Sequence, residues 1–158
     1  MAINHFIRPT APSKASLAVR LGATGNPAGN FTDVEVGKIV KLVGESQYDL
    51  CVAGNDIEAI ITSVEPATQN GWTIGGVLDS GIAWARADGL QATPGTGTVA
   101  VGDYVVAGAI TAKGTALTDW PKVVVATTPA NSVHKWRVVS LGTAGTGAVG
   151  TTIVIKRV

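Results

Sequence analysis

Turn-forming residues recur about every 8–12 residues along this chain, and this short interval limits what it can fold into. Twenty of the 158 residues are glycine, and many of them flank short segments rich in Val, Ile and Thr. No stretch carries a sustained apolar stripe at helical spacing. Short strands between frequent turns are typical of β-sandwiches and barrels. We therefore predict an all-β fold: a single β-barrel or β-sandwich domain over residues 16–158, with an extended N-terminal arm over residues 1–15.

The expected strands are short, and several alternate in polarity. In Ser16–Leu21 every second residue is a larger apolar one, which predicts one buried face. Asp56 could cap a helix over residues 56–62, but four β-branched residues among the next six favour a strand. Gly37 is expected to mark a bulge or bend, and residues 87–98 a loop. The predicted strands cover residues 16–21, 33–43, 48–52, 57–64, 72–78, 81–86, 104–110, 123–126, 136–141 and 151–158.

Charge is sparse and unevenly distributed along the chain. Charged residues make up 15% of the sequence, so uncharged polar residues or partners must cover much of the surface. Residues 1–32 carry +3, residues 33–119 carry −7 because all eleven acids lie there with four bases, and residues 120–158 carry +5. These regions can complement one another within one fold or between neighbouring copies. A net charge of +1 and the lack of dense Lys/Arg clusters argue against a nucleic-acid partner.

The sequence gives no reason to expect a membrane partner or an oxidising compartment. Its longest apolar runs are far shorter than the roughly 20 residues that a spanning helix needs. Asn4, His5 and Arg8 interrupt the N-terminal apolar residues, so no signal peptide is predicted. The single cysteine, Cys51, cannot form an internal disulfide and fits assembly in a cytoplasm.

The predicted arm has the character of a docking segment. Pro9 and Pro12 disfavour regular pairing and extend the chain before them. Its apolar residues suit either contact with a neighbouring subunit or a return to its own domain as an edge strand, and both alternatives stay open. Together with two residues of the domain, the arm supplies the candidate interaction residues: Ile3, Phe6, Ile7, Arg8, Lys14, Arg20 and Trp120.

Catalytic residues are not evident. His5 lies in the arm, where a catalytic group could not be held rigidly, and His134 lies in a polar turn, where we expect it to face solvent. Cys51 lies between two apolar residues and is expected to be a small buried hydrophobic residue. Glu58 and Glu65 could form a carboxylate pair for sugar hydrolysis, but a solvated face explains them better. We predict that the chain is not an enzyme.

Metal and cofactor sites are not predicted either. Two histidines and one cysteine are too few for a structural zinc cluster. Asp49, Asn55, Asp56 and Glu58 lie close in sequence but lack the spacing of a calcium loop. The glycine-rich stretch 142–147 lies between two expected strands rather than before a helix, so it is not a phosphate-binding loop.

The four tryptophans, Trp72, Trp84, Trp120 and Trp136, fall on separate segments. Two or three of them are expected to anchor the core, because each buries a large apolar area. Trp120 follows a Thr/Asp-rich loop and precedes a proline, which makes it the candidate for an exposed contact.

Three segments resemble the head decoration, or capsid cement, proteins of tailed bacteriophages: residues 54–77 (GNDIEAIITSVEPATQNGWTIGGV), 99–108 (VAVGDYVVAG) and 136–158 (WRVVSLGTAGTGAVGTTIVIKRV). In that family a Gly-Asp pair opens a strand, as Gly102 and Asp103 would here. A strand, a Gly/Thr/Ala loop and a final apolar strand then close the domain.

This resemblance implies a β-barrel or sandwich that binds the outside of the head shell and stabilises it against the pressure of the packaged DNA. The implied partners are the major capsid protein and neighbouring copies of the chain, with a trimer favoured over a dimer. The implied location is the capsid surface of the virion, after assembly in the host cytoplasm. An extended terminal arm that reaches adjacent subunits is common in such proteins.

Three other functions stay open. A phage tail, baseplate or fibre component would share the β pattern, but a receptor-binding role should expose aromatic residues in one cleft. A carbohydrate-binding module would present two coplanar exposed tryptophans. A hydrolase would need clustered carboxylates, or a partner for His134 in a pocket.

Overall fold

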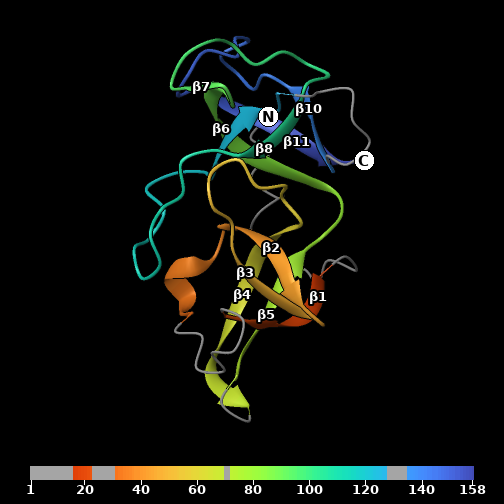
Figure 1. Cartoon of the computed structure of the whole chain (residues 1–158), viewed down its shortest axis with the longest axis vertical. Helices are drawn as coiled ribbons and strands as arrows, with labels where there is room; N and C mark the ends of the chain where they lie inside the picture. Colours follow the sequence, from red (N-terminus) through yellow and green to blue (C-terminus); the bar gives the residue numbers. More distant parts are fainter. Residues whose placement is uncertain (1–15, 23–30, 70–71, 128–134) are drawn as a thin grey trace.

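The computed structural model describes residues 16–22, 31–69, 72–127 and 135–158, and all its regular elements but one are strands (Figure 1). The all-β prediction is confirmed; the predicted arm lies outside the described residues. The first group of elements is β1 (Ser16–Leu21), the 3-10 turn η1 (Asp33–Glu35), β2 (Ile39–Gly44), β3 (Gln47–Leu50), β4 (Ala59–Gln69) and β5 (Trp72–Leu78). The second group is β6 (Ile82–Leu90), β7 (Thr93–Pro94), β8 (Tyr104–Ala107), β9 (Lys122–Val125), β10 (Trp136–Ser140) and β11 (Thr152–Arg157).

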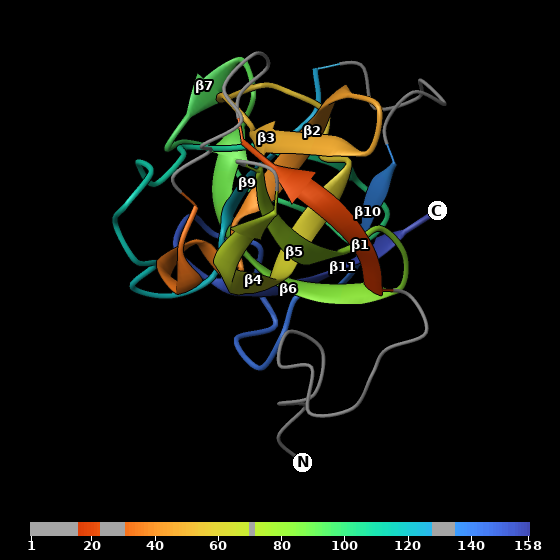
Figure 2. The ribbon, with the colours of Figure 1, turned by 90° about the horizontal axis from the view of Figure 1, so that it is seen from below.

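Strands β1 to β5 close into a barrel, called the first barrel below, which is seen from its end in Figure 2. Its strand order is β1-β3-β2-β4-β5, and β5 pairs with β1 to complete the ring. The pairing of β1 with β3 is parallel, and the others are antiparallel. The alternation predicted for β1 is confirmed where its side chains are described, because Val19 and Leu21 are buried while Ala18 and Arg20 are exposed.

The remaining strands form a six-stranded sheet in the order β11-β10-β8-β9-β6-β7. Since β11 also pairs with β6, this sheet closes into a second ring, with β7 attached to β6. We call it the second barrel. Strands β6 and β9 are parallel, and the other neighbours are antiparallel. Figure 1 shows the first barrel below and the second above, joined through β5 and β6.

Two main clusters of buried residues fill the barrels. The smaller one, which includes Leu21 and Tyr48, lies in the first barrel. The larger one surrounds Trp136, which is 0% exposed, and extends into the first barrel through Ile60 and Leu78. Trp136 is thus one of the predicted core anchors. Because residues of both barrels pack in the larger cluster, burial of apolar surface holds the two barrels together.

The strand predicted over residues 33–43 is wrong in its first part, which forms η1; strand β2 begins only at Ile39. The side chain of Glu35 folds back and accepts a hydrogen bond from the amide of Thr32, which stabilises a helical turn. Gly37 follows with φ +92°, a left-handed conformation that suits glycine. The bend predicted at Gly37 is therefore confirmed.

The loop predicted over residues 87–98 is wrong at its start, because β6 continues to Leu90 and pairs with the short strand β7. Gly89 allows this tight hairpin, since a Cβ there would lie 2.1 Å from the carbonyl oxygen of Thr96. The choice of strand over helix near Asp56 is confirmed, with β4 beginning at Ala59. The other predicted strands are present, with ends that differ by a few residues.

Candidate functional site

The connection between β8 and β9, residues 108–121, forms a wall of a cavity of about 280 Å³. Residues from both barrels line it, so we call it the waist cavity. Its apolar wall residues are Ile39, Ala109, Ile110, Leu117, Trp120 and Pro121. Its polar wall residues are Lys38, Arg86, Thr111, Thr118, Asp119 and Lys122. A wall with both kinds of residue is typical of sites that orient a ligand through a few polar groups.

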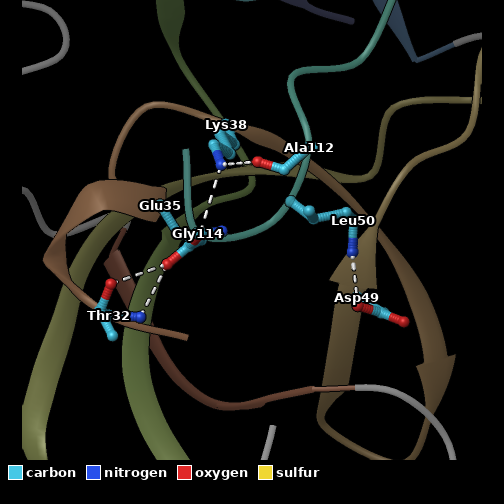
Figure 3. Close-up of polar contacts among 7 residues, drawn as sticks. All are labelled: Thr32, Glu35, Lys38, Asp49, Leu50, Ala112 and Gly114. Carbon is cyan, nitrogen blue, oxygen red and sulfur yellow. Dashed lines mark hydrogen bonds and ion pairs between the residues drawn. The ribbon is translucent and has the colours of Figure 1, made fainter. Parts of the chain in front are cut away.

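A buried ion pair attaches this connection to the first barrel (Figure 3). Glu35 and Lys38 are 0% and 2% exposed, and Lys38 Nζ lies 3.3 Å from Glu35 Oε1. The same carboxylate oxygen accepts a 2.6 Å hydrogen bond from the amide of Gly114, and Lys38 Nζ donates to the carbonyl oxygen of Ala112 at 2.9 Å. The pair, called the Glu35–Lys38 clamp below, therefore holds the middle of the β8–β9 connection against η1.

The carboxylate of the clamp is stabilised in its charged form. Burial acts to raise the pKa of Glu35, but hydrogen bonds from Thr32, Gly114 and Lys38 outweigh it and keep the pKa below the ordinary value of 4.5. Glu35 is therefore ionised at neutral pH. Since both partners are also hydrogen-bonded to backbone groups, neither charge is left uncompensated in the interior.

Trp120, the residue that the sequence predicts as an exposed contact, is half-buried in the cavity wall. Its ring stacks on that of Trp84, with centroids 6.2 Å apart and an angle of 20° between the planes. The structure therefore brings two of the four tryptophans together. They stack on each other and do not form the side-by-side platform considered for a carbohydrate-binding module.

The charge asymmetry of the sequence is partly used within one chain. Glu58, in the acidic middle region, pairs with Lys135 and Arg157 of the basic C-terminal region. Glu58 is therefore held by two cations, whereas Glu65 is exposed. Glu65 lies on β4, seven residues beyond Glu58 along the chain.

Cys51 is 2% exposed, as predicted for a small buried hydrophobic residue. Burial is the main cause that raises the pKa of its thiol to about 12, so the reactive thiolate is suppressed at neutral pH. Nearby, the Asn55 side chain accepts a 2.9 Å hydrogen bond from the amide of Val52 and closes a turn. Across the described ranges, no group of three His, Cys, Asp or Glu residues is placed to hold a metal ion.

Most of the candidate interaction residues predicted from the sequence cannot be placed. The arm residues and both histidines lie outside the described residues: Ile3, His5, Phe6, Ile7, Arg8, Lys14 and His134. Arg20 is exposed on β1 and does not line the waist cavity. Of the predicted interaction residues that are described, only Trp120 therefore belongs to the cavity.

The sequence pattern does not reveal the clamp or the ion pair between Arg86 and Asp119 in the cavity wall. The Thr-x-x-Glu pattern at residues 32–35 is a capping-box signal, and it could have indicated the turn that places Glu35. No local signal identifies the acceptor of Lys38, because Ala112 is 74 residues away in the chain.

Comparisons with known proteins found no match. No family model matches the chain, and neither a curated protein nor a solved structure matches it. In the part of the chain that the structure describes, no helix has the length and apolar character needed to cross a membrane.

Proposed function

We propose that this chain is a capsid cement protein of a tailed bacteriophage, which binds the outer surface of the head shell and stabilises it. In this proposal its partners are the major capsid protein and neighbouring copies of itself, with a trimer favoured. It assembles in the host cytoplasm and resides on the capsid surface of the virion. The observation that carries the proposal is a group of exposed valines on the second barrel.

These valines lie on chain segments that are hydrogen-bonded to one another. Thr98 forms a β-bridge with Ala148, and the amide of Gly102 donates to the carbonyl oxygen of Val138 at 2.9 Å. The connection between β10 and β11, blue in Figure 1, lies at the end of the second barrel away from the first. The group, called the valine rim below, consists of Val101, Val139 and Val149, which are 59%, 38% and 41% exposed.

Exposed apolar side chains on adjoining segments favour an interaction surface over a freely solvated one. The described residues contain seven exposed large hydrophobic residues, and five of them belong to the second barrel or its connections: Leu90, Val101, Val139, Val149 and Val158. A shell repeats the same contact many times, so a modest apolar surface on each copy can give firm attachment.

The backbone around the rim also agrees with the pattern from which the resemblance was drawn. Gly102, with φ +101°, and Asp103 directly precede β8. The Asp103 carboxylate accepts a 2.8 Å hydrogen bond from the amide of Ala100, which closes the turn before the strand. A Gly/Thr/Ala-rich connection after β10 then leads to the final apolar strand β11. These features support the proposal without identifying a partner.

The test is co-sedimentation of the purified chain with heads of the parent phage that lack it. We expect the wild-type chain to pellet with heads, and the double variant Val101→Asp/Val139→Asp to bind at least about tenfold more weakly, since two charges would be buried in the contact. Leu42→Asp is the matched control, because Leu42 is 52% exposed on the first barrel. It should bind like the wild type.

A chain that stays in the supernatant at all head concentrations would contradict the proposal. Pelleting with isolated tails but not with heads would favour the tail or baseplate alternative. Circular dichroism of each variant checks that the barrels remain folded, so that a loss of binding can be assigned to the rim.

A further inference from the structure

The waist cavity has a chemistry that attachment to a head shell does not explain. We propose that it binds one neutral sugar ring, the terminal or internal unit of a glycan. The proposal stands on the charge balance, the hydrogen-bonding groups and the aromatic residue of the cavity wall, and it does not depend on the proposed function.

Each cation in the wall has a carboxylate of its own. Lys38 pairs with Glu35 at 3.3 Å, and Arg86 pairs with Asp119. The third cation follows the same rule, because Lys122 Nζ lies 3.7 Å from Asp88 Oδ1. The cavity therefore has no excess charge to attract an anion or a cation, and this balance favours a neutral polar ligand.

The same groups offer donors and acceptors at fixed positions. Lys38 Nζ carries three N–H groups, and its two acceptors among the described residues are Glu35 and Ala112. The side chain of Lys38 is 3% exposed, so the more accessible donors of the wall are those of Arg86, Thr111, Thr118 and Lys122. Asp119, whose side chain is 40% exposed, has further acceptor sites on its carboxylate. Hydroxyl groups both donate and accept, so a polyhydroxylated ring matches such a mixed wall.

Trp120 supplies the apolar face that a sugar ring requires. Trp120 lines the cavity, whereas Trp84, on which it stacks, does not. Stacking on Trp84 helps to fix the orientation of the Trp120 indole, and the Glu35–Lys38 clamp fixes the connection that carries Trp120. A preorganised indole can pack against the C–H face of a pyranose without first being ordered.

The size of the cavity limits the ligand. A volume of about 280 Å³ lies just below the usual range for small-molecule sites, roughly 300–1,000 Å³, and suits a single ring rather than an extended peptide. A ligand of about a dozen non-hydrogen atoms with ordinary efficiency binds with a Kd on the order of 1 mM. Affinity for a glycan on a cell or a particle then depends on many copies binding together.

The experiment is a titration of the full, isotope-labelled chain with methyl glycosides of glucose, galactose, mannose and N-acetylglucosamine, followed by NMR of the tryptophan indole N–H groups. We expect at least one glycoside to shift the Trp120 and Trp84 signals saturably, with a Kd of about 1 mM. Trp120→Ala should weaken binding at least about tenfold, and Asp119→Asn should weaken it less. The control Leu42→Ala, on the first barrel, should leave the Kd unchanged.

Three results would overturn the proposal. The first is the absence of a saturable shift with all four glycosides. The second is an unchanged Kd in Trp120→Ala, whose backbone NMR spectrum reports whether it is folded. The third is a methyl glucuronide that binds at least about tenfold more tightly than the methyl glucoside, because the cavity would then select an anion. Head co-sedimentation of Trp120→Ala separates the two proposals, since the valine rim is intact in this variant.

Discussion

The two barrels are built on the same closed arrangement of short strands but differ in what they enclose and expose. The first barrel surrounds a smaller cluster of its own, which includes Leu21 and Tyr48. The second barrel contains Trp136, and its cluster continues into the first barrel at Ile60. The second barrel also carries most of the exposed large hydrophobic residues of the described chain. The shared cluster therefore joins the barrels, while exposed apolar side chains are concentrated on the second one.

The largest effect is expected from Trp136→Ala, because it empties the centre of the shared cluster. The free energy of unfolding should fall by about 3–5 kcal/mol. Urea unfolding measures the loss, and hydrogen exchange should show amides of both barrels losing protection together. Loss of protection in β6–β11 alone would contradict a cluster that stabilises both barrels.

A smaller and more local effect is expected from Leu21→Ala. Leu21 is 0% exposed and packs in the cluster of the first barrel, close to where a Cβ on Gly75 would lie. The expected loss is about 2–3 kcal/mol, with exchange protection reduced first in β1 to β5. An equal loss of protection in β6 to β11 would contradict this prediction, because it would mean that the smaller cluster does not stabilise the first barrel separately.

The smallest of the three losses of stability is expected from a change in the Glu35–Lys38 clamp, which links the first barrel to the β8–β9 connection. Glu35→Gln keeps the side-chain shape but removes the charge, and should cost about 1–2 kcal/mol at pH 7. The pKa of Glu35 is lowered in the folded chain, so the unfolded chain binds more protons below pH 4.5. The stabilisation by this carboxylate is therefore present above pH 4.5 and is lost as the pH falls through the lowered pKa of the folded state.

Urea unfolding of the wild type and of Glu35→Gln between neutral and acidic pH tests this prediction. The difference between the two proteins should shrink as the solution becomes more acidic. Glu35→Asp is a useful comparison, because it retains the charge but shortens the reach to Gly114. A difference that does not change with pH would mean that the charge of Glu35 does not stabilise the fold.

The sequence predicted the strands where alternation and turn residues agree, as in β1, and it predicted the bend at Gly37. It failed at residues 33–38, where a side chain that returns to the backbone of Thr32 converts an apparent strand into η1. It also did not distinguish one closed sheet from two, since the closing pairs β1–β5 and β6–β11 join segments far apart in the chain.

The candidate site was predictable only in part. The position of Trp120 after a polar loop predicts an exposed contact, yet its stacking on Trp84 depends on how the β8–β9 connection folds. That fold depends on Glu35 and Gly114, which are 79 residues apart. Contacts at such separations are set by the packing of the whole chain, and local patterns carry no information about them.

The most direct test of the proposed attachment is hydrogen–deuterium exchange of the chain, free and bound to heads of the parent phage. We expect new protection in residues 98–102, 138–140 and 147–150, which carry or adjoin the valine rim, and little change in β1 to β5. Protection gained in the first barrel, with the rim segments exchanging as in the free chain, would contradict it.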